Sequence, residues 1–339
     1  MAPLPELIQA LLDPKIYPHP PERVELVQTQ MSFVFLAGDL VYKVKKPVNL
    51  GYLDYTTLTK RHFFCRREVE LNRRLCADVY LGVVAITGHE GKVSLDGPGK
   101  PIEYAVQMRC LPQERMMSAM LVRDQVTPAM LASMAGKLAE FHNKAETNAA
   151  ISAFGALDTI RQNTAENFEQ TGQYIGVTIS PERYRSIKTY TEAFMAQNSS
   201  LFQRRISEGR IRDCHGDLHA AHICFSNGIC IYDCIEFNDR FRYGDVASEV
   251  AFLAMDLDHY GRADLSRRFV EAYVTASKDQ ELQTLLNFYK CYRAYVRGKV
   301  EGFKLDDPHI SKSEKAKIFT VARDYFELAE SYTSPGESG

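Results

Sequence analysis

Residues 214–222 of the chain read CHGDLHAAH, and residues 232–234 read YDC. Asp217 therefore lies in a loop-forming stretch, whereas Asp233 follows two short apolar runs separated by Asn227 and Gly228, a typical hairpin turn. A carboxylate on a rigid loop can accept a proton from a hydroxyl group. A second carboxylate is a suitable ligand for a hard cation. The stretch predicts a site that combines a general base with a metal ligand.

The composition predicts a globular protein with a small-molecule partner. The chain has 339 residues, of which 45% are hydrophobic, and a formal net charge of −2. This length exceeds what one compact core usually holds, so we expect two lobes. Because both signs of charge are interspersed, the sequence offers no patch for nucleic acid or an anionic membrane. No apolar run approaches the roughly 20 residues that span a bilayer. The oligomeric state stays unknown at this level.

The cysteines indicate a reducing environment. The eight cysteines contain no CxxC pair, and the first residues lack the basic and apolar segments of a secretory signal. We therefore expect free thiols and a cytoplasmic location.

The first third of the chain is rich in strand patterns. A proline-rich leader covers residues 1–22. Three short β-rich runs follow, a helical pattern covers 56–75, and two further strand patterns come before Pro112. The expected strands are 24–28, 32–36, 40–45, 81–87 and 103–108. We interpret residues 1–108 as an N-terminal lobe with a five-stranded antiparallel sheet and one helix.

The rest of the chain, residues 109–339, is mainly helical. Thr127-Pro128 and Ser180-Pro181 are typical helix starts, the second opening a helix that should end near Gly209. Three more helices are expected at 245–259, 263–277 and 280–302. Strands that precede helices, rather than alternate with them, favour the α+β class.

Residues 215–219 (HGDLH), Asp233 and residues 242–247 (RYGDVA) resemble the aminoglycoside phosphotransferase family of the protein-kinase-like superfamily. The resemblance implies a bilobal protein-kinase-like fold, with a catalytic loop at 214–222 and a metal-binding segment at 230–245. It also implies an ATP-dependent or GTP-dependent kinase, with Mg²⁺ or Mn²⁺, that phosphorylates a hydroxyl group of a small molecule. The chain would belong to a branch of that family that phosphorylates small molecules.

The resemblance also implies roles for the acids. Asp217 matches the catalytic Asp, which orients and deprotonates the acceptor hydroxyl. Asp233 matches the Asp that holds the metal ion. His222 stands where the family has an Asn metal ligand. Since imidazole suits Mg²⁺ poorly, His222 is either a weak ligand, a phosphate contact, or neither.

Lys43 is the expected contact of the nucleotide phosphates. It shares one face of its strand with Val41, as in the family's nucleotide-facing strand, and Lys45 on the same face is the alternative. Glu68 falls on the apolar face of its helix, where a carboxylate needs a partner. We therefore expect Glu68 to bind Lys43 and position it.

Weaker candidates complete the nucleotide site. The turn at 28–32 (QTQMS) contains no glycine, so Ser32 or backbone amides should cover the phosphates. The resemblance implies that backbone groups of Met108 and Arg109 meet the adenine edge. His219 is either a γ-phosphate contact or a structural imidazole. For the acceptor, Arg293 and Arg297 lie one helical turn apart and could hold an anionic group.

Two alternatives remain. The cluster His215, Asp217, His219 and His222 is also typical of a metallohydrolase. In addition, His222 in place of Asn and the glycine-free turn fit a non-catalytic nucleotide-binding pseudokinase.

Overall fold

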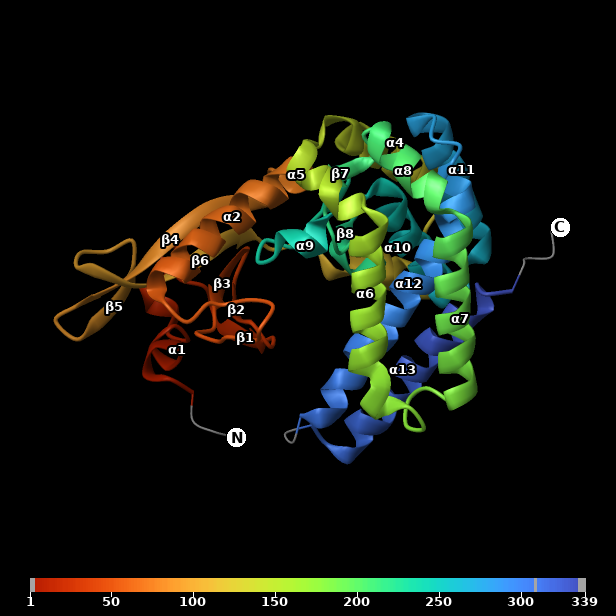
Figure 1. The fold of residues 1–339 in the computed structure, drawn as a ribbon. Coiled ribbons are helices and arrows are strands. Elements are labelled where there is room, and N and C mark those ends of the chain that lie inside the picture. The colour runs from red at the N-terminus through yellow and green to blue at the C-terminus, as the bar shows by residue number, and fades with distance from the viewer. Residues whose placement is uncertain (1–3, 308–309, 335–339) are drawn as a thin grey trace. The chain divides into compact units, whose positions relative to one another are not determined.

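The computed structural model describes residues 4–307 and 310–334 in two compact units (Figure 1). The first unit contains residues up to Ala119 together with 221–239, and the second contains 120–220 and 240 onward. We describe each unit by itself.

The first unit contains a six-stranded antiparallel sheet with the strand order β1-β2-β3-β6-β4-β5. Its strands are β1 (Val24–Gln28), β2 (Ser32–Ala37), β3 (Leu40–Lys45), β4 (Tyr80–His89), β5 (Lys92–Leu95) and β6 (Lys100–Arg109). The five expected strands are present, but the expected count was wrong because β5 was missed. This strand has four residues and lies between turns at Gly91 and Asp96, both with positive φ. A strand of four residues is too short to show a recognisable alternation of apolar and polar residues.

The leader packs on this sheet, as its apolar residues predict. Its helices are α1 (Glu6–Ala10) and the 3₁₀ turn η1 (Pro14–Ile16). Ile8 and Tyr17 are buried in one apolar cluster with Phe35, Tyr42 and Ile86 of the sheet. The leader therefore closes part of the sheet's core.

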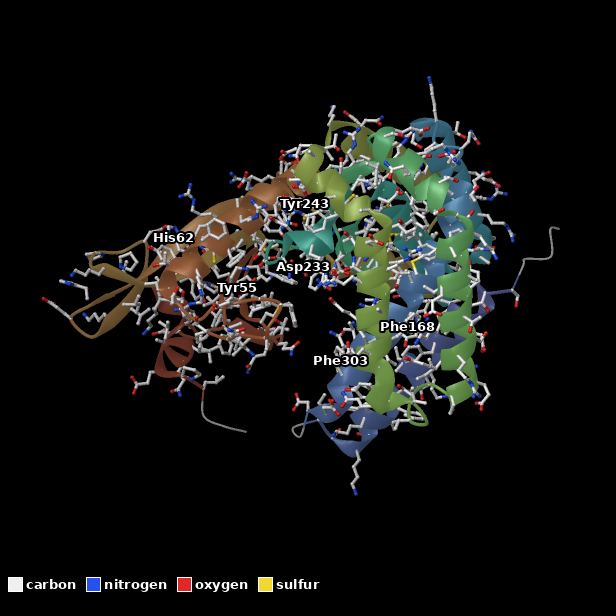
Figure 2. All side chains as sticks on the ribbon, in the orientation of Figure 1. Tyr55, His62, Phe168, Asp233, Tyr243 and Phe303 are labelled. Atoms are coloured by element: carbon white, nitrogen blue, oxygen red, sulfur yellow. A yellow bond between two sulfur atoms is a disulfide. The ribbon has the colours of Figure 1, made fainter. Side chains whose placement is uncertain are left out.

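Helix α2 (Leu58–Cys76) packs along β4 and β6 (Figure 1). The Thr57 side chain caps its first turn by accepting a hydrogen bond from the Lys60 N–H. His62 stacks on Tyr104 of β6 at 3.8 Å between ring centroids (Figure 2). Val69 joins an apolar cluster with Val106.

A hairpin of β8 (Ile223–Cys224) and β9 (Cys230–Ile231) completes the first unit. Cys230 forms a disulfide with Cys76 at the end of α2, with the two Cα atoms 4.7 Å apart. The expectation of eight free thiols was therefore wrong, and six cysteines remain free among the described residues. The partners are 154 positions apart, so their spacing in the sequence gave no signal of the pairing.

The second unit is mainly helical. Its longer helices are α4 (Pro128–Lys144), α6 (Leu157–Thr171), α7 (Pro181–Gln197), α8 (Ser199–Ser207), α10 (Val246–His259), α11 (Ala263–Ser277), α12 (Leu282–Phe303) and α13 (Lys312–Ser331). The shorter elements are α5 (Ala149–Ser152), the paired strands β7 (Ile211–Asp213) and β10 (Tyr243–Asp245), and the 3₁₀ turns η3 (Ala153–Gly155), η4 (Gly172–Tyr174) and η6 (Lys304–Asp306). The chain crosses between the units within α3 (Met117–Val122), η5 (Ala220–His222) and α9 (Asp239–Arg242), and η2 (Gln113–Arg115) belongs to the first unit.

The core of the second unit gathers around α10 and α12. Phe252 and Tyr295 are buried there with Phe326 of α13. Phe168 of α6 (Figure 2) lies 4.9 Å from Tyr295 between ring centroids. The helix expected from Ser180 to Gly209 is interrupted at Asn198, whose side chain donates to the Phe194 carbonyl at 3.0 Å. This bond ends α7 before α8 begins.

The two units differ from the lobes expected at 1–108 and 109–339. Residues 110–119 stay with the sheet, and 221–239 return to it. As a result, Asp233 belongs to the same unit as Lys43 and Glu68, whereas Asp217 belongs to the helical unit. Across the described ranges, no helix is both long and apolar enough to cross a membrane.

The disulfide should stabilise the first unit. Because it closes a loop of 154 positions, the double substitution Cys76→Ser and Cys230→Ser should lower the free energy of unfolding by up to about 5 kcal/mol. Urea unfolding with and without a thiol reductant measures this. Cys110→Ser, at an exposed free thiol, is the matched control. If the unfolding midpoint of the wild-type protein is the same with and without the reductant, the disulfide does not stabilise the fold.

Candidate active site

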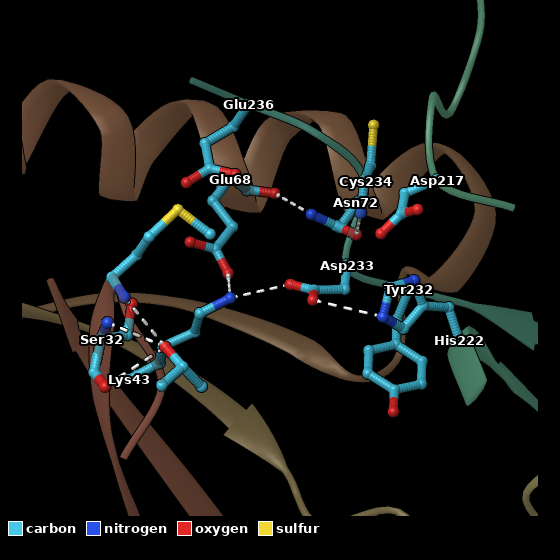
Figure 3. A network of polar contacts seen from close by, with 12 residues as sticks. Ser32, Lys43, Glu68, Asn72, Asp217, His222, Tyr232, Asp233, Cys234 and Glu236 are labelled. Atoms are coloured by element: carbon cyan, nitrogen blue, oxygen red, sulfur yellow. Dashed lines mark hydrogen bonds and ion pairs between the residues drawn. The ribbon is translucent and has the colours of Figure 1, made fainter. Parts of the chain in front are cut away.

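Lys43 links two acids in the first unit. Its Nζ lies 2.8 Å from Asp233 Oδ1 and 2.9 Å from Glu68 Oε1, as Figure 3 shows. The Asp233 contact is a hydrogen bond, whereas Glu68 Oε1 accepts no hydrogen bond within the described residues. The contact between Lys43 and Glu68 is an ion pair. The ion pair expected between Lys43 and Glu68 is present.

Lys45, the alternative on the same strand, has a different role. Its Nζ donates to Glu68 Oε2 at 2.6 Å and also to Glu236 Oε1. The Tyr55 hydroxyl donates to the same Glu236 oxygen at 2.6 Å. The Lys45 side chain is only 1% exposed, compared with 19% for Lys43. Lys45 is thus enclosed, and Lys43 is the lysine that solvent or a ligand can reach.

Burial and charge act in opposite directions on these groups. Burial alone would lower the pKa of Lys43 and of Lys45, but the carboxylates around them raise both values well above the ordinary lysine pKa. Burial alone would raise the pKa of Glu68, and the two lysines lower it below its ordinary value. All three groups are therefore charged at neutral pH.

Asp233 is held in an uncommon backbone conformation. Its φ is 62°, in the left-handed region, which Asp tolerates better than most residues. Its N–H donates to the Tyr80 hydroxyl at 3.2 Å, and the next N–H, of Cys234, donates to Asn72 Oδ1 at 2.9 Å. The side chain keeps 40% of its surface exposed. The backbone is fixed while the carboxylate stays accessible.

His222 lies next to Asp233 in the same unit. Its Nε2 is 3.5 Å from Asp233 Oδ2 (Figure 3), and its carbonyl accepts the Tyr232 N–H at 3.0 Å. An imidazole N–H at this point can orient the carboxylate, and an unprotonated nitrogen can bind a metal. Both roles fit the geometry.

The loop that carries Asp217 is anchored by a buried acid of the second unit. Glu249 of α10 accepts the His215 N–H at 2.8 Å and the Gly216 N–H at 2.6 Å. His142 of α4 contacts the same carboxylate at 2.8 Å. Burial alone would raise the pKa of Glu249, but the bond from His142 and the surrounding groups lower it to about 2. The loop's backbone amides therefore face a permanent negative charge.

Two further contacts hold this loop. The Ala220 N–H donates to Asp256 Oδ2 at 2.8 Å. Arg293 of α12 donates to the Gly216 carbonyl at 3.2 Å and to Ser248. Arg293 therefore supports the loop backbone, whereas Arg297 has its guanidinium over the Tyr325 ring.

Asp217 itself is partly accessible. Its side chain is 32% exposed, and its Oδ2 lies 3.6 Å from Nε2 of His219. Its N–H donates to Nδ1 of the buried His215 at 3.3 Å. The His219 ring packs against Phe252 at 5.6 Å, which fits the structural alternative for that imidazole.

Some of the groups expected to contact the nucleotide already form hydrogen bonds within the protein. The Ser32 N–H donates to the Thr29 hydroxyl at 2.9 Å, and Ser32 is buried. Met108 lies in the sheet opposite Val41. The Arg109 N–H donates to the Val79 carbonyl at 2.9 Å. An adenine edge that used this N–H would have to replace that bond.

The sequence analysis missed several residues that shape the site, namely Tyr55, Tyr80, His142, Glu236 and Glu249, and it missed the loop-anchoring role of Asp256. Glu249 and Asp256 carried a usable signal, because both are acids within the very apolar stretch 246–257. The same argument that selected Glu68 applies to them.

One family model matches the chain. Residues 65–285 match the family described as "Phosphotransferase enzyme family". Uncharacterised proteins of Mycobacterium bovis and Mycobacterium tuberculosis are 35% identical over 279 residues, which is 82% of this chain and 54% of theirs. The chain thus spans about half the length of these relatives.

Solved structures share the fold at low identity. A choline/ethanolamine kinase family protein from Mesorhizobium loti has a TM-score of 0.52 at 12% identity, covering 96% of this chain and 98% of its own. The GDP complex of aminoglycoside 2'-phosphotransferase-IIIa has a TM-score of 0.54 at 14% identity, with 96% and 99% covered. An amicoumacin kinase with AMP-PNP and Ca²⁺ has a TM-score of 0.54 at 13% identity, with 95% and 92% covered. The expected α+β, protein-kinase-like fold is confirmed.

Glu249 should contribute a pH-dependent share of stability. Because its pKa is lowered from 4.5 to about 2, the charge should add on the order of 3 kcal/mol above pH 4.5. This share should disappear as the pH falls from about 4.5 toward 2. We expect Glu249→Gln to unfold at lower urea than wild type at pH 7, with the difference shrinking at pH 3. A difference that stays constant with pH would contradict the lowered pKa.

Proposed function

Because the chain belongs to the phosphotransferase enzyme family, we propose that it transfers the γ-phosphoryl group of ATP or GTP to a hydroxyl group of a small molecule. In this proposal Lys43, Glu68 and Asp233 bind the nucleotide phosphates and their metal ion, and Asp217 acts on the acceptor. The curated relatives are about twice as long, so the proposal concerns this chain alone.

The observation that carries the proposal is the position of Lys43 between Glu68 and Asp233 (Figure 3). A lysine ammonium paired with a buried carboxylate is a fixed positive charge, suited to nucleotide phosphates. Asp233 accepts a hydrogen bond from the same ammonium group, and its side chain is 40% exposed. The Lys43 ammonium group therefore connects Glu68, in the proposed phosphate-binding group, with Asp233, the proposed metal ligand.

The donor set fits a divalent cation. The network contains the carboxyl groups of Glu68, Asp233 and Glu236 and the ammonium groups of Lys43 and Lys45. Among these side chains, that of Asp233 is the most exposed, at 40%. Asp233 would hold Mg²⁺ or Mn²⁺, with His222 as a further ligand or as the group that orients Asp233. When bound, the ion would neutralise phosphate charge.

Asp217 would act as the base. The acceptor oxygen forms a bond to the γ-phosphorus, the bond from that phosphorus to the bridging oxygen breaks, and the hydroxyl proton passes to the Asp217 carboxylate. The anchors at Glu249, Asp256 and Arg293 keep the loop rigid, which this role requires. An enzyme of this kind needs a compartment that supplies nucleotide.

Within the second unit, one contact weighs against a metallohydrolase. Nδ1 of His215 accepts the Asp217 N–H, and the His215 ring is buried, so this nitrogen is not a metal ligand. The pseudokinase alternative rests on His222 and on the glycine-free turn at 28–32, and a measurement of turnover decides it.

Nucleotide and metal should act together. We expect ATP or GTP to raise the melting temperature only when Mg²⁺ or Mn²⁺ is present. A metallohydrolase would retain a transition metal after dialysis and would not respond to nucleotide. Nucleotide binding without turnover on any acceptor in a panel of sugars, amino sugars, nucleosides and small alcohols would instead support the pseudokinase.

Substitutions should distinguish the roles of Asp217 and Asp233. Asp217→Asn should lower kcat by about 10²–10⁴-fold because the proton acceptor is lost, with metal-dependent nucleotide binding retained. Asp233→Asn, which keeps the left-handed backbone accessible, should lose metal-dependent turnover and metal-dependent nucleotide binding. Release of γ-phosphate and thermal shift measure the two effects. Asp158→Asn, at an exposed acid of α6, is the control, and equal losses in all three variants would refute the assigned roles.

A further inference from the structure

We propose that Lys45, Glu236 and Tyr55 form a permanent bridge that positions Asp233, while Lys43 alone changes its partner when the nucleotide binds. Glu236 is thus a positioning residue for the metal site. The inference rests on the proposed function and assigns a positioning role to residues that would contact neither the nucleotide nor the acceptor.

The network is a chain of alternating charges. In order, its contacts run from Asp233 to Lys43, Glu68, Lys45 and Glu236, which also accepts from Tyr55. Lys43 and Lys45 are two residues apart on β3 and bind opposite oxygens of Glu68. Asp233 and Glu236 are three residues apart and bind different lysines. The segment 233–236 is therefore attached to β3 at both of its ends.

The two attachments differ in exposure. Lys45, Glu68 and Glu236 have side chains that are 1%, 0% and 7% exposed. Separating them would leave buried charges without partners, which costs several kcal/mol. Asp233 is 40% exposed, so its carboxylate can be solvated or can bind a cation at little cost. The Glu236 end is the fixed one.

The two lysines differ in the same sense. Lys45 donates hydrogen bonds to both of its glutamates. Lys43 pairs with the buried Glu68 and with Asp233, whose side chain is 40% exposed. If Asp233 held a metal ion, Lys43 would give up that partner and would contact the nucleotide phosphates instead. The bonds to Tyr80 and Asn72 would still hold the backbone at 233–234, and Glu236 would keep the segment attached to β3.

The test is the metal dependence of turnover. We expect Glu236→Gln to raise the Mg²⁺ concentration for half-maximal turnover roughly tenfold, as the loss of a charge-assisted hydrogen bond predicts. KM for ATP at saturating Mg²⁺ should change much less, because Lys43 and Glu68 are intact. Tyr55→Phe, which keeps every charge, should shift the Mg²⁺ dependence in the same direction by a smaller factor. The Mg²⁺ dependence of the Tyr55→Phe variant provides the test if the Glu236→Gln variant does not fold.

Glu103→Gln is the matched control. Glu103 is a buried acid of the same unit, paired with Arg61 at 2.7 Å, and the network does not contain it. Its substitution should lower the melting temperature and leave the Mg²⁺ dependence unchanged. If Glu236→Gln or Tyr55→Phe behaves like this control, Glu236 is merely structural and the inference is wrong. A wild type without turnover and without Mg²⁺-dependent stabilisation by ATP would instead overturn the proposed function.

Discussion

The buried carboxylate of Glu68 is the group on which the first unit's site depends. A charge without solvent is tolerated only when partners replace the lost hydration. Glu68 has two such partners, and both come from one face of β3. The need to neutralise this single acid therefore fixes the rotation of α2 and the register of β3 relative to each other. It also makes Lys43 a preformed cation rather than a mobile side chain.

Helix α2 does more than supply Glu68. Asn72, one turn further along, accepts the Cys234 N–H, Arg74 reaches the Cys234 sulfur at 3.4 Å, and Cys76 is joined to Cys230. The last turns of one helix thus hold both Cys234 and Cys230, the residues that flank Asp233 in its segment. This explains why a piece of chain more than a hundred residues beyond the sheet folds with it. In the second unit α10 has a comparable role, since Glu249 and Asp256 lie two turns apart and hold the two ends of the Asp217 loop.

Most of the features that follow from a local sequence pattern were predicted from the sequence. The strands around Lys43 alternate, and Glu68 stands out as an acid on an apolar face, so both their elements and their pairing could be inferred. Asp217 and Asp233 were recognisable because the spacing of their motif is specific. By contrast, the Cys76–Cys230 bond and the Lys45–Glu236 contact join residues far apart in the chain, and no local pattern encodes such partners. Strand β5 and the break at Asn198 were missed because short turns and one side-chain hydrogen bond outweighed the periodicity.

The left-handed backbone at Asp233 restricts which amino acids can occupy the position. Glycine accepts this conformation freely and asparagine accepts it readily, whereas branched and bulky residues do not. Among the residues that tolerate it, only aspartate brings a formal negative charge. Steric fit and electrostatic demand therefore select the same side chain, and a glutamate, although equally charged, would satisfy only one of them.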